Sequence, residues 1–232
     1  MKLLHISDLH DSMVDLSVFP DHHVIVTGDI TNDGREGQFL AAHDALRGHK
    51  GGLSLVPGNH DYGWQGNLYS RESARRFDEI LSAPLQGHCF ADKVPLVRKF
   101  DGVTLIGLNS NLETSSPFDF ACGEIGQAQS QLLDDALAGN GGVKIIALHH
   151  HPFMHSDATM KLVDAQAFWR VVEGRADVVL FGHKHESDRW SGRYGIPHVL
   201  AADNSPVSGF AREILLEGGN ITINTVKVRQ TQ

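Results

Sequence analysis

Short apolar runs recur along the chain, and each of them ends directly at a cluster of polar residues. These runs occupy residues 3–6, 24–26, 53–56, 103–108, 143–148 and 178–181. Their apolar positions are mostly continuous, without the alternation of a half-exposed strand, which is typical of strands covered on both faces. The pattern therefore predicts buried strands, each followed by a polar loop.

Segments with helical spacing lie between these predicted strands. Their apolar faces comprise Phe39, Ala42 and Leu46; Ala74, Phe77, Ile80 and Leu81; Leu132, Leu133 and Leu137; and Phe168, Val171 and Val172. Ser70 is a candidate cap of the second helix, and Gly174 is a candidate stop of the fourth. Strands that alternate with helices predict an α/β protein whose sheet core is largely parallel.

The final part of the chain has a different pattern. Residues 213–217 and 221–228 form two strand-like runs that flank Gly218, Gly219 and Asn220. We expect an antiparallel β-hairpin with a glycine turn at about residues 213–228. The sequence contains no internal repeat and no stretch resembling a linker, so we expect one domain over residues 1–232.

Composition narrows the class of protein. The chain is 41% hydrophobic and 21% charged, with a formal net charge of −8 that disfavours non-specific binding of nucleic acid. Cys89 and Cys122 form no CxxC pair, and we expect two reduced thiols. The sequence shows neither a signal-peptide core nor an apolar run long enough for a membrane span. We therefore expect a cytoplasmic protein with no membrane partner.

Chemistry-bearing side chains fall at the carboxyl ends of the predicted strands. In open α/β sheets the loops at this edge form the ligand crevice, so these side chains should converge. They are Asp8 and His10; Asp29; Asn59, His60 and Asp61; His149, His150 and His151; and His183 and His185.

These residue types form a ligand set of carboxylate, amide and imidazole groups without thiolate. Such a set suits Mn, Fe, Ni, Co or Zn better than a structural zinc site. Taken alone, Asp8 with His10 is an ordinary solvated strand end, and Gly28-Asp29 is an ordinary turn. The ordered combination, with each element at a strand end, favours a metal site.

The order of these motifs resembles the calcineurin-like metallophosphoesterase superfamily. The motifs are Asp8-Leu9-His10, Gly28-Asp29, Gly58-Asn59-His60-Asp61, His150-His151-Pro152 and Gly182-His183-Lys184-His185. The resemblance implies a four-layer α/β/β/α sandwich, in which two packed mixed β-sheets are flanked by helices.

The resemblance also implies a dinuclear centre. It assigns Asp8, His10 and His185 to one transition-metal ion, Asn59, His150 and His183 to the other, and Asp29 to a bridge between them. His150 is chosen among the three adjacent histidines because the family's ligand lies two residues before the proline, here Pro152. His149 would then finish the strand, and His151 would lie behind the ligands or face the pocket.

Two further side chains are candidates for catalysis. Two metal ions that share a hydroxide can drive an in-line attack on phosphorus, and His60 is then placed to protonate the leaving oxygen. Asp61 is expected to orient the His60 imidazole; the alternative is a helix cap or turn residue. Tyr62 and Trp64 would stack on a flat leaving group or pack beneath the loop.

The motif variants are most similar to the cyclic-nucleotide and glycerophosphodiester phosphodiesterase branch. The segment between Asp8 and Asp29 is short for that branch, so residues 11–21 hold at most a turn or two of helix. We expect a phosphodiesterase that acts on a small molecule. The alternatives are a phosphomonoesterase, a nuclease and a non-catalytic scaffold, and the oligomeric state is left open.

Overall fold

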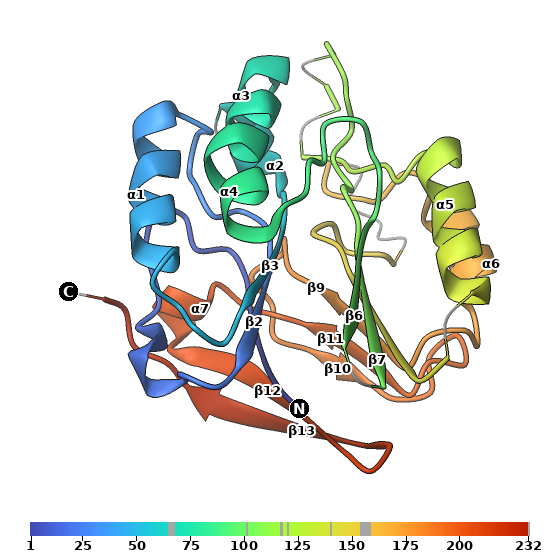
Figure 1. The fold of residues 1–232 in the computed structure, drawn as a ribbon. Helices are drawn as coiled ribbons and strands as arrows, with labels where there is room; N and C mark the ends of the chain where they lie inside the picture. The colour runs from blue at the N-terminus through green and yellow to red at the C-terminus, as the bar shows by residue number, and fades with distance from the viewer. Residues whose placement is uncertain are drawn as a thin grey trace.

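Two mixed β-sheets lie at the centre of the molecule, between two groups of helices (Figure 1). The computed structural model describes residues 1–64, 68–100, 102–116, 118–119, 121–139, 141–153 and 159–231. All six buried strands predicted from apolar runs are present. They are β1 (Lys2–Ile6), β2 (His23–Thr27), β3 (Leu53–Val56), β7 (Val103–Gly107), β8 (Val143–Ala147) and β9 (Val178–Phe181).

The first sheet has the strand order β13-β12-β1-β2-β3. Strand β1 pairs in parallel with β2, and β2 in parallel with β3, whereas β12 (Phe210–Glu217) runs antiparallel to β1. Strand β13 (Asn220–Lys227) pairs with β12 around a turn in which Gly218 and Gly219 have φ values of 57° and 84°. A hairpin therefore lies where the sequence predicts one.

The second sheet has the strand order β10-β11-β9-β8-β7-β6. Its central strands β11 (His198–Ala201), β9, β8 and β7 are parallel, and the outer strands β10 (Arg189–Trp190) and β6 (Leu96–Phe100) are antiparallel to their neighbours. The sequence patterns gave no signal for β6, β10 or β11. A separate two-stranded ribbon pairs β4 (Gly63–Trp64) with β5 (Leu68–Tyr69).

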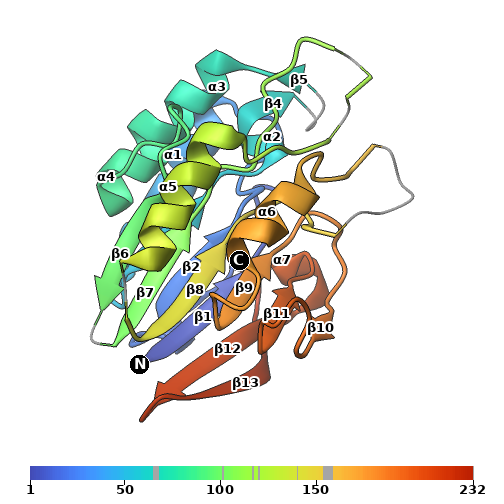
Figure 2. The same ribbon diagram turned by 90° about the vertical axis from the view of Figure 1, so that its right-hand side faces the viewer.

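The helices form the outer layers of the sandwich. Figures 1 and 2 show α1 (Glu36–Leu46), α3 (Arg71–Arg76) and α4 (Ala83–Gln86) on the side of the first sheet, and α5 (Gln127–Ala138) and α6 (Ala165–Val172) on the side of the second. A π-helical segment, Phe77–Ser82, joins α3 to α4, and two single-turn helices complete the set: α2 (Asn59–Tyr62) and α7 (Ser205–Ser208). This arrangement confirms the expected four-layer fold.

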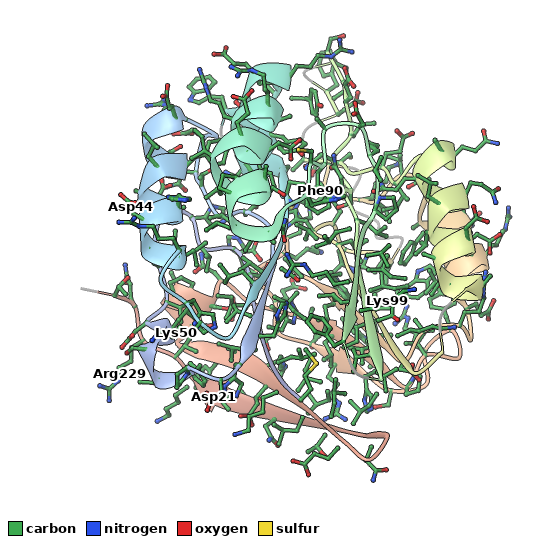
Figure 3. The ribbon with its side chains drawn as sticks, in the orientation of Figure 1. Asp21, Asp44, Lys50, Phe90, Lys99 and Arg229 are labelled. Atoms are coloured by element: carbon green, nitrogen blue, oxygen red, sulfur yellow. The ribbon has the colours of Figure 1, made fainter. Side chains whose placement is uncertain are left out.

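Alternate residues of β8 face two different cores. Ile145 and Ala147 belong to the core that contains residues of the first sheet, whereas Ile146 and Leu148 pack with residues of α5 and α6. Both faces of the strand are therefore buried, which explains its continuous apolar run. Figure 3 labels Phe90, a fully buried side chain that lies between the helices of the first layer and strand β6.

Three of the four predicted apolar helix faces are buried, at least in large part, and one needs a correction. Ser70 caps α3 by accepting a hydrogen bond from the backbone N–H of Ser73, as expected. On α5, Leu133 and Leu137 are buried, but Leu132 is 43% exposed and Gln129 is buried in its place. Gln129 lies on that face because its side chain bonds the backbone of Asn109.

The first crossover of the sheet contains only one 3₁₀ turn, Leu16–Val18, in agreement with the short segment between Asp8 and Asp29. The carboxyl-terminal residues run beside it. Val14 forms a β-bridge with Gln230, and the N–H of Asp15 donates to the carbonyl of Arg229, which Figure 3 labels.

No helix within the described ranges is both long and apolar enough to cross a membrane.

Candidate metal centre

Five loops meet at the carboxyl-terminal edge of the two sheets. They follow β1, β2, β3, β8 and β9, and each carries at least one of the expected site residues. Strands β1, β2 and β3 are mutually parallel, as are β8 and β9, so the ends of each set lie at one edge. Three clusters of side chains result: Asp8, His10 and His185; His10, Asp29 and His60; and Asp29, His149 and His183. Within each cluster the candidate ligand atoms lie within 4.8 Å of one another.

The first cluster joins the loops after β1 and β9. The Nε2 atoms of His10 and His185 lie 3.0 Å apart, and His185 Nε2 lies 3.4 Å from Asp8 Oδ1. Asp29 Oδ2 approaches His10 Nε2 at 3.9 Å from the loop after β2. Asp8, His10 and His185 therefore present donor atoms close to one another, with the Asp29 carboxylate beside them.

The third cluster, of Asp29, His149 and His183, lies deeper. The Nε2 atom of His149 is 2.9 Å from Asn59 Oδ1, 3.1 Å from His183 Nδ1 and 3.2 Å from Asp29 Oδ2. Asp29 Oδ2 thus lies near His10 of the first cluster as well as His149 of the third, so the carboxylate lies between the two. His149, His183 and Asp29 are all buried.

The structure places His149 in this cluster, whereas the spacing of the family motif, counted back from Pro152, led us to expect His150. His149 follows Ile145 and Ala147 in the alternation of β8, so it faces the space between the sheets. His150 faces the other way, where its Nδ1 lies 2.8 Å from Ser110 Oγ and its ring packs against Gly123. The structure thus brings His149, and not the expected His150, among the candidate donor atoms, and strand alternation is the signal in the sequence that points to it.

The hydrogen bond on the far side of His149 fixes its tautomer. Nδ1 lies 2.7 Å from the carbonyl oxygen of Thr27, and a carbonyl only accepts, so Nδ1 carries the proton. Nε2 then points a lone pair at the Asn59 oxygen unless the ring is protonated. Burial by itself lowers the pKa of His149, but the Asp29 carboxylate raises it to about 9. The position therefore demands a proton or a metal cation.

Backbone strain is concentrated at the same residues. Of the eight non-glycine residues with positive φ in the described ranges, five are expected ligands: Asp8, His10, Asp29, His183 and His185. Each left-handed residue costs about 1–2 kcal/mol, although Asp and His tolerate this region better than most residues. Strain of this kind persists where it aims functional groups.

Gly182 permits the close approach of β1 and β9. A Cβ atom at this position would overlap Ser7 Oγ and Asp8 Oδ2. The backbone N–H of His183, the next residue, donates to both carboxylate oxygens of Asp8 at 3.1 and 3.2 Å. The glycine therefore allows the loop after β9 to contact the Asp8 loop.

His60 lies at the edge of the clusters, held by two hydrogen bonds. Its backbone N–H donates to Asp29 Oδ1 at 2.9 Å, and its Nδ1 lies 2.8 Å from the carbonyl oxygen of Asn32. The ring packs edge-on against His10, with 4.6 Å between centroids. Asn32 was not among the residues singled out from the sequence, because a backbone carbonyl leaves no signal in the residue type.

Asp61 has hydrogen-bond partners other than the His60 imidazole that the sequence led us to expect. Asp61 is fully buried and accepts hydrogen bonds from Gly58 N, Thr31 N and Thr31 Oγ1 at 2.8–3.1 Å. It therefore caps α2 and ties the helix to the loop after β2, the alternative that the sequence left open. Burial, together with the nearby Asp29 charge, raises the pKa of Asp61 to about 6.

The remaining candidates divide between core and surface. Tyr62 is 1% exposed and packs in the core beneath the loop, whereas Trp64 is 55% exposed. His151 is buried against Phe153 and Phe181 and belongs to none of the three clusters of candidate ligands. Lys184 is partly buried.

Comparison with known proteins gives three results. A family model described as calcineurin-like phosphoesterase matches residues 1–187. A probable cyclic nucleotide phosphodiesterase of Rhodopseudomonas palustris is 27% identical over 78% of this chain and 65% of its own length. A protein with the same description from Moraxella catarrhalis is 29% identical over 70% of this chain and 57% of its own length.

Solved structures with a similar fold cover the whole chain. The crystal structure of a dimetal phosphatase from Danio rerio matches with a TM-score of 0.72, covering 99% of this chain and 98% of the other, at 14% identity. At that identity the likeness concerns the fold. The chain spans about 60% of the length of the two curated relatives given above.

Proposed function

Because this chain belongs to the calcineurin-like phosphoesterase family, we propose that it hydrolyses phosphoester bonds at the candidate metal centre, using two transition-metal ions. The observation that carries the proposal is the shared position of Asp29 between two clusters of nitrogen and oxygen donors. One bridging carboxylate with neutral and anionic donors on either side suits a pair of Mn, Fe, Zn, Ni or Co ions.

The proposed ligand set follows the two clusters. Asp8, His10 and His185 hold one ion, and Asn59, His149 and His183 hold the other, with Asp29 shared between them. The donor set fits such ions because lone pairs of His149 and Asn59 face each other at 2.9 Å, a contact that a cation relieves. When bound, the two metal ions supply an activated water and positive charge for the phosphoryl oxygens.

His60 is proposed as the proton donor to the leaving oxygen. Its Nδ1 already donates to the Asn32 carbonyl, so Nε2 is the atom left to carry the transferred proton. One ring nitrogen of His60 lies within 4.8 Å of candidate ligand atoms of His10 and Asp29, which puts the proton beside the reacting group. General acid catalysis typically contributes about 10²–10⁴-fold.

The substrate class proposed is a small phosphodiester. The two curated relatives are described as probable cyclic nucleotide phosphodiesterases, and the motif variants resemble the same branch. The net charge of −8 also opposes binding of a long polyanion. A phosphomonoesterase, a nuclease and a non-catalytic scaffold are alternative outcomes of the test.

Hydrolysis by the purified protein tests the proposal. The chain is incubated with Mn²⁺ and either bis(p-nitrophenyl) phosphate or p-nitrophenyl phosphate, and we expect faster turnover of the diester. The matched variant His60→Ala should retain both ions, measured by elemental analysis, and lose about 10²–10⁴-fold in turnover of poor leaving groups. Loss of metal from that variant would make His60 a ligand instead of an acid.

The alternatives give distinct results in the same experiment. Faster release from the monoester identifies a phosphomonoesterase. Turnover of single-stranded DNA but of neither small ester identifies a nuclease. Two bound ions without turnover of any substrate identify a scaffold.

A further inference from the structure

The contact between His60 and Asn32 is the starting point. His60 Nδ1 donates to the Asn32 carbonyl at 2.8 Å, so the position of that carbonyl decides where the imidazole points. A backbone carbonyl in a loop can fix the orientation of the imidazole only if other contacts hold its own residue in place. Asn32 is exposed, so burial does not hold it.

The Asn32 side chain supplies the anchor. Its Nδ2 donates to Asp11 Oδ2 at 2.7 Å and to the carbonyl oxygen of His10 at 3.3 Å. Both acceptors belong to the loop after β1, which carries His10 itself. Asn32 therefore ties the proposed acid, through its backbone, to the backbone of a proposed ligand.

Gln38 completes the anchor from helix α1. Its Nε2 donates to the same Asp11 oxygen at 2.7 Å, while its Oε1 accepts from the backbone N–H groups of Asp33 and Arg35 at 3.2 and 3.1 Å. Two donors on one carboxylate oxygen make charge-assisted bonds, which are stronger than neutral ones. The Asp11 backbone N–H donates to the Ile30 carbonyl at 3.0 Å, and this bond holds the backbone that carries the carboxylate.

We propose that Asp11, Asn32 and Gln38 form a clamp that positions His60, and that these three are positioning residues for the proposed reaction. The inference rests on the proposed function for its catalytic meaning. Asp11 and Asn32 are exposed polar residues outside the two hydrophobic cores, so a role in core stability gives no account of the network. The network reaches the proposed reaction through the His60 ring, which bonds the Asn32 carbonyl.

The first test reads the His60 ring directly. In the metal-free chain, long-range ¹H–¹⁵N correlations at alkaline pH report which ring nitrogen carries the proton. The wild type should show His60 as the Nδ1–H tautomer, and Asn32→Ala should populate the Nε2–H tautomer as well. An unchanged tautomer in Asn32→Ala overturns the clamp.

The second test reads catalysis through the leaving group. Diphenyl phosphate leaves as a poor phenolate and needs the acid more than bis(p-nitrophenyl) phosphate does. Asn32→Ala should lower kcat for diphenyl phosphate about tenfold more than for bis(p-nitrophenyl) phosphate, without change in KM or in bound Mn²⁺, a fraction of the general-acid effect. An equal loss on both substrates, or loss of metal, overturns the proposal.

A charge swap guards against misfolding of the single variants. Gln38→Glu keeps the acceptor for Asp33 and Arg35 but sets two carboxylates against each other, and should act like Asn32→Ala. Adding Asp11→Asn restores a donor and an acceptor to the pair and should recover most of the lost kcat on diphenyl phosphate. Failure of this double variant to recover, while folded, counts against the clamp.

The control is Asp44→Asn, an exposed carboxylate on the same helix, labelled in Figure 3, which should match the wild type in both tests. If the wild type with Mn²⁺ hydrolyses neither diester, the proposed function fails, whereas the tautomer measurement still decides whether Asn32 holds His60.

Discussion

The amide oxygen of Asn59 and the Nε2 atom of His149 face each other at 2.9 Å, although the two residues are 90 positions apart in the chain. Because His149 Nδ1 already donates to the Thr27 carbonyl, the neutral ring offers only a lone pair to an atom that has only lone pairs. The contact is stable with a proton or a metal ion between the two atoms. This relationship gives the first two predictions.

Substitution of adjacent histidines should separate ligand from neighbour. We expect His149→Ala to weaken metal binding by at least about 100-fold. Loss of a residue that only hydrogen-bonds a metal ligand already costs about 10–100-fold, and loss of the ligand itself should cost more. His150→Gln, which can still bond Ser110, should bind both ions. Elemental analysis and titration calorimetry measure the difference. The reverse pattern would restore the assignment of His150.

Metal binding should release a proton at neutral pH. The pKa of His149, about 9, lies above its ordinary value near 6.5, so the ring is protonated in the metal-free chain at pH 7. An incoming ion must displace that proton, and affinity should rise about tenfold per pH unit up to about pH 9. Calorimetry in two buffers with different ionisation enthalpies counts the protons. A zero proton count at pH 7 contradicts this prediction.

Asp29→Asn should empty both positions together. The Asp29 carboxylate lies 3.2 Å from His149 and 3.9 Å from His10, and an amide supplies one good oxygen in place of two charged ones. The stoichiometry of bound Mn²⁺ should fall from two to below about 0.2 per chain at micromolar metal, as expected for loss of a ligand common to two ions. Asp33→Asn, in the same loop, is the matched control. Two ions retained by Asp29→Asn would exclude a bridge.

The strain at His185 should be measurable in the metal-free protein. His185 has a φ of 53°, a region in which alanine is strained and glycine is not. We expect His185→Gly to be more stable than His185→Ala by about 1 kcal/mol in urea unfolding with a chelator present. Equal stability of the two variants would mean that the loop relaxes without cost.

Acid should destabilise the fold through a histidine outside the site. Burial is the main cause that lowers the pKa of His23 to about 4, and its Nε2 bonds Ser54 Oγ at 2.8 Å. The unfolded chain, with a value near 6.5, binds the proton first, so stability falls as the pH drops from about 6.5 to about 4, by up to about 1.4 kcal/mol per unit.

His23→Gln should remove the contribution of one proton from that slope. Urea unfolding of the metal-free variants between pH 7 and pH 5 gives the slopes. An identical slope for His23→Gln and the wild type would show that other groups carry the acid sensitivity.

The sequence predicted the strands that matter for the site because they are buried on both faces and read as continuous apolar runs. The sequence did not predict the edge strands β6 and β10 or the short β11. Edge strands mix apolar and polar residues, as Arg98 and Lys99 do in β6, and form no continuous apolar run. Leu132 was wrongly placed on the buried face of α5. Gln129 lies there instead because it bonds the backbone of Asn109, a contact that helical periodicity cannot predict. Tertiary contact decided each of these cases.

The site shows the same division. The residue types and their order at strand ends predicted which loops meet, because the edge of parallel strands is a property of the fold. The choice between His149 and His150 depended on which face of β8 each one occupies, and the partner of His60 is a backbone atom of Asn32. The ligand roles, the single domain and the cellular location stay predictions.

The position of β1 has a consequence for how the molecule comes into being. Its two neighbours are β2, which is synthesised soon after it, and β12, whose Leu215 pairs with Lys2 and is synthesised much later. Until then one side of β1 has unpaired backbone groups, and contacts of such long sequence separation form slowly. The loop of Asp8 and His10 thus gains its full support only once β12 has been synthesised, and a nascent fragment ending near residue 187 would expose the unpaired edge of β1 to chaperones or to other chains.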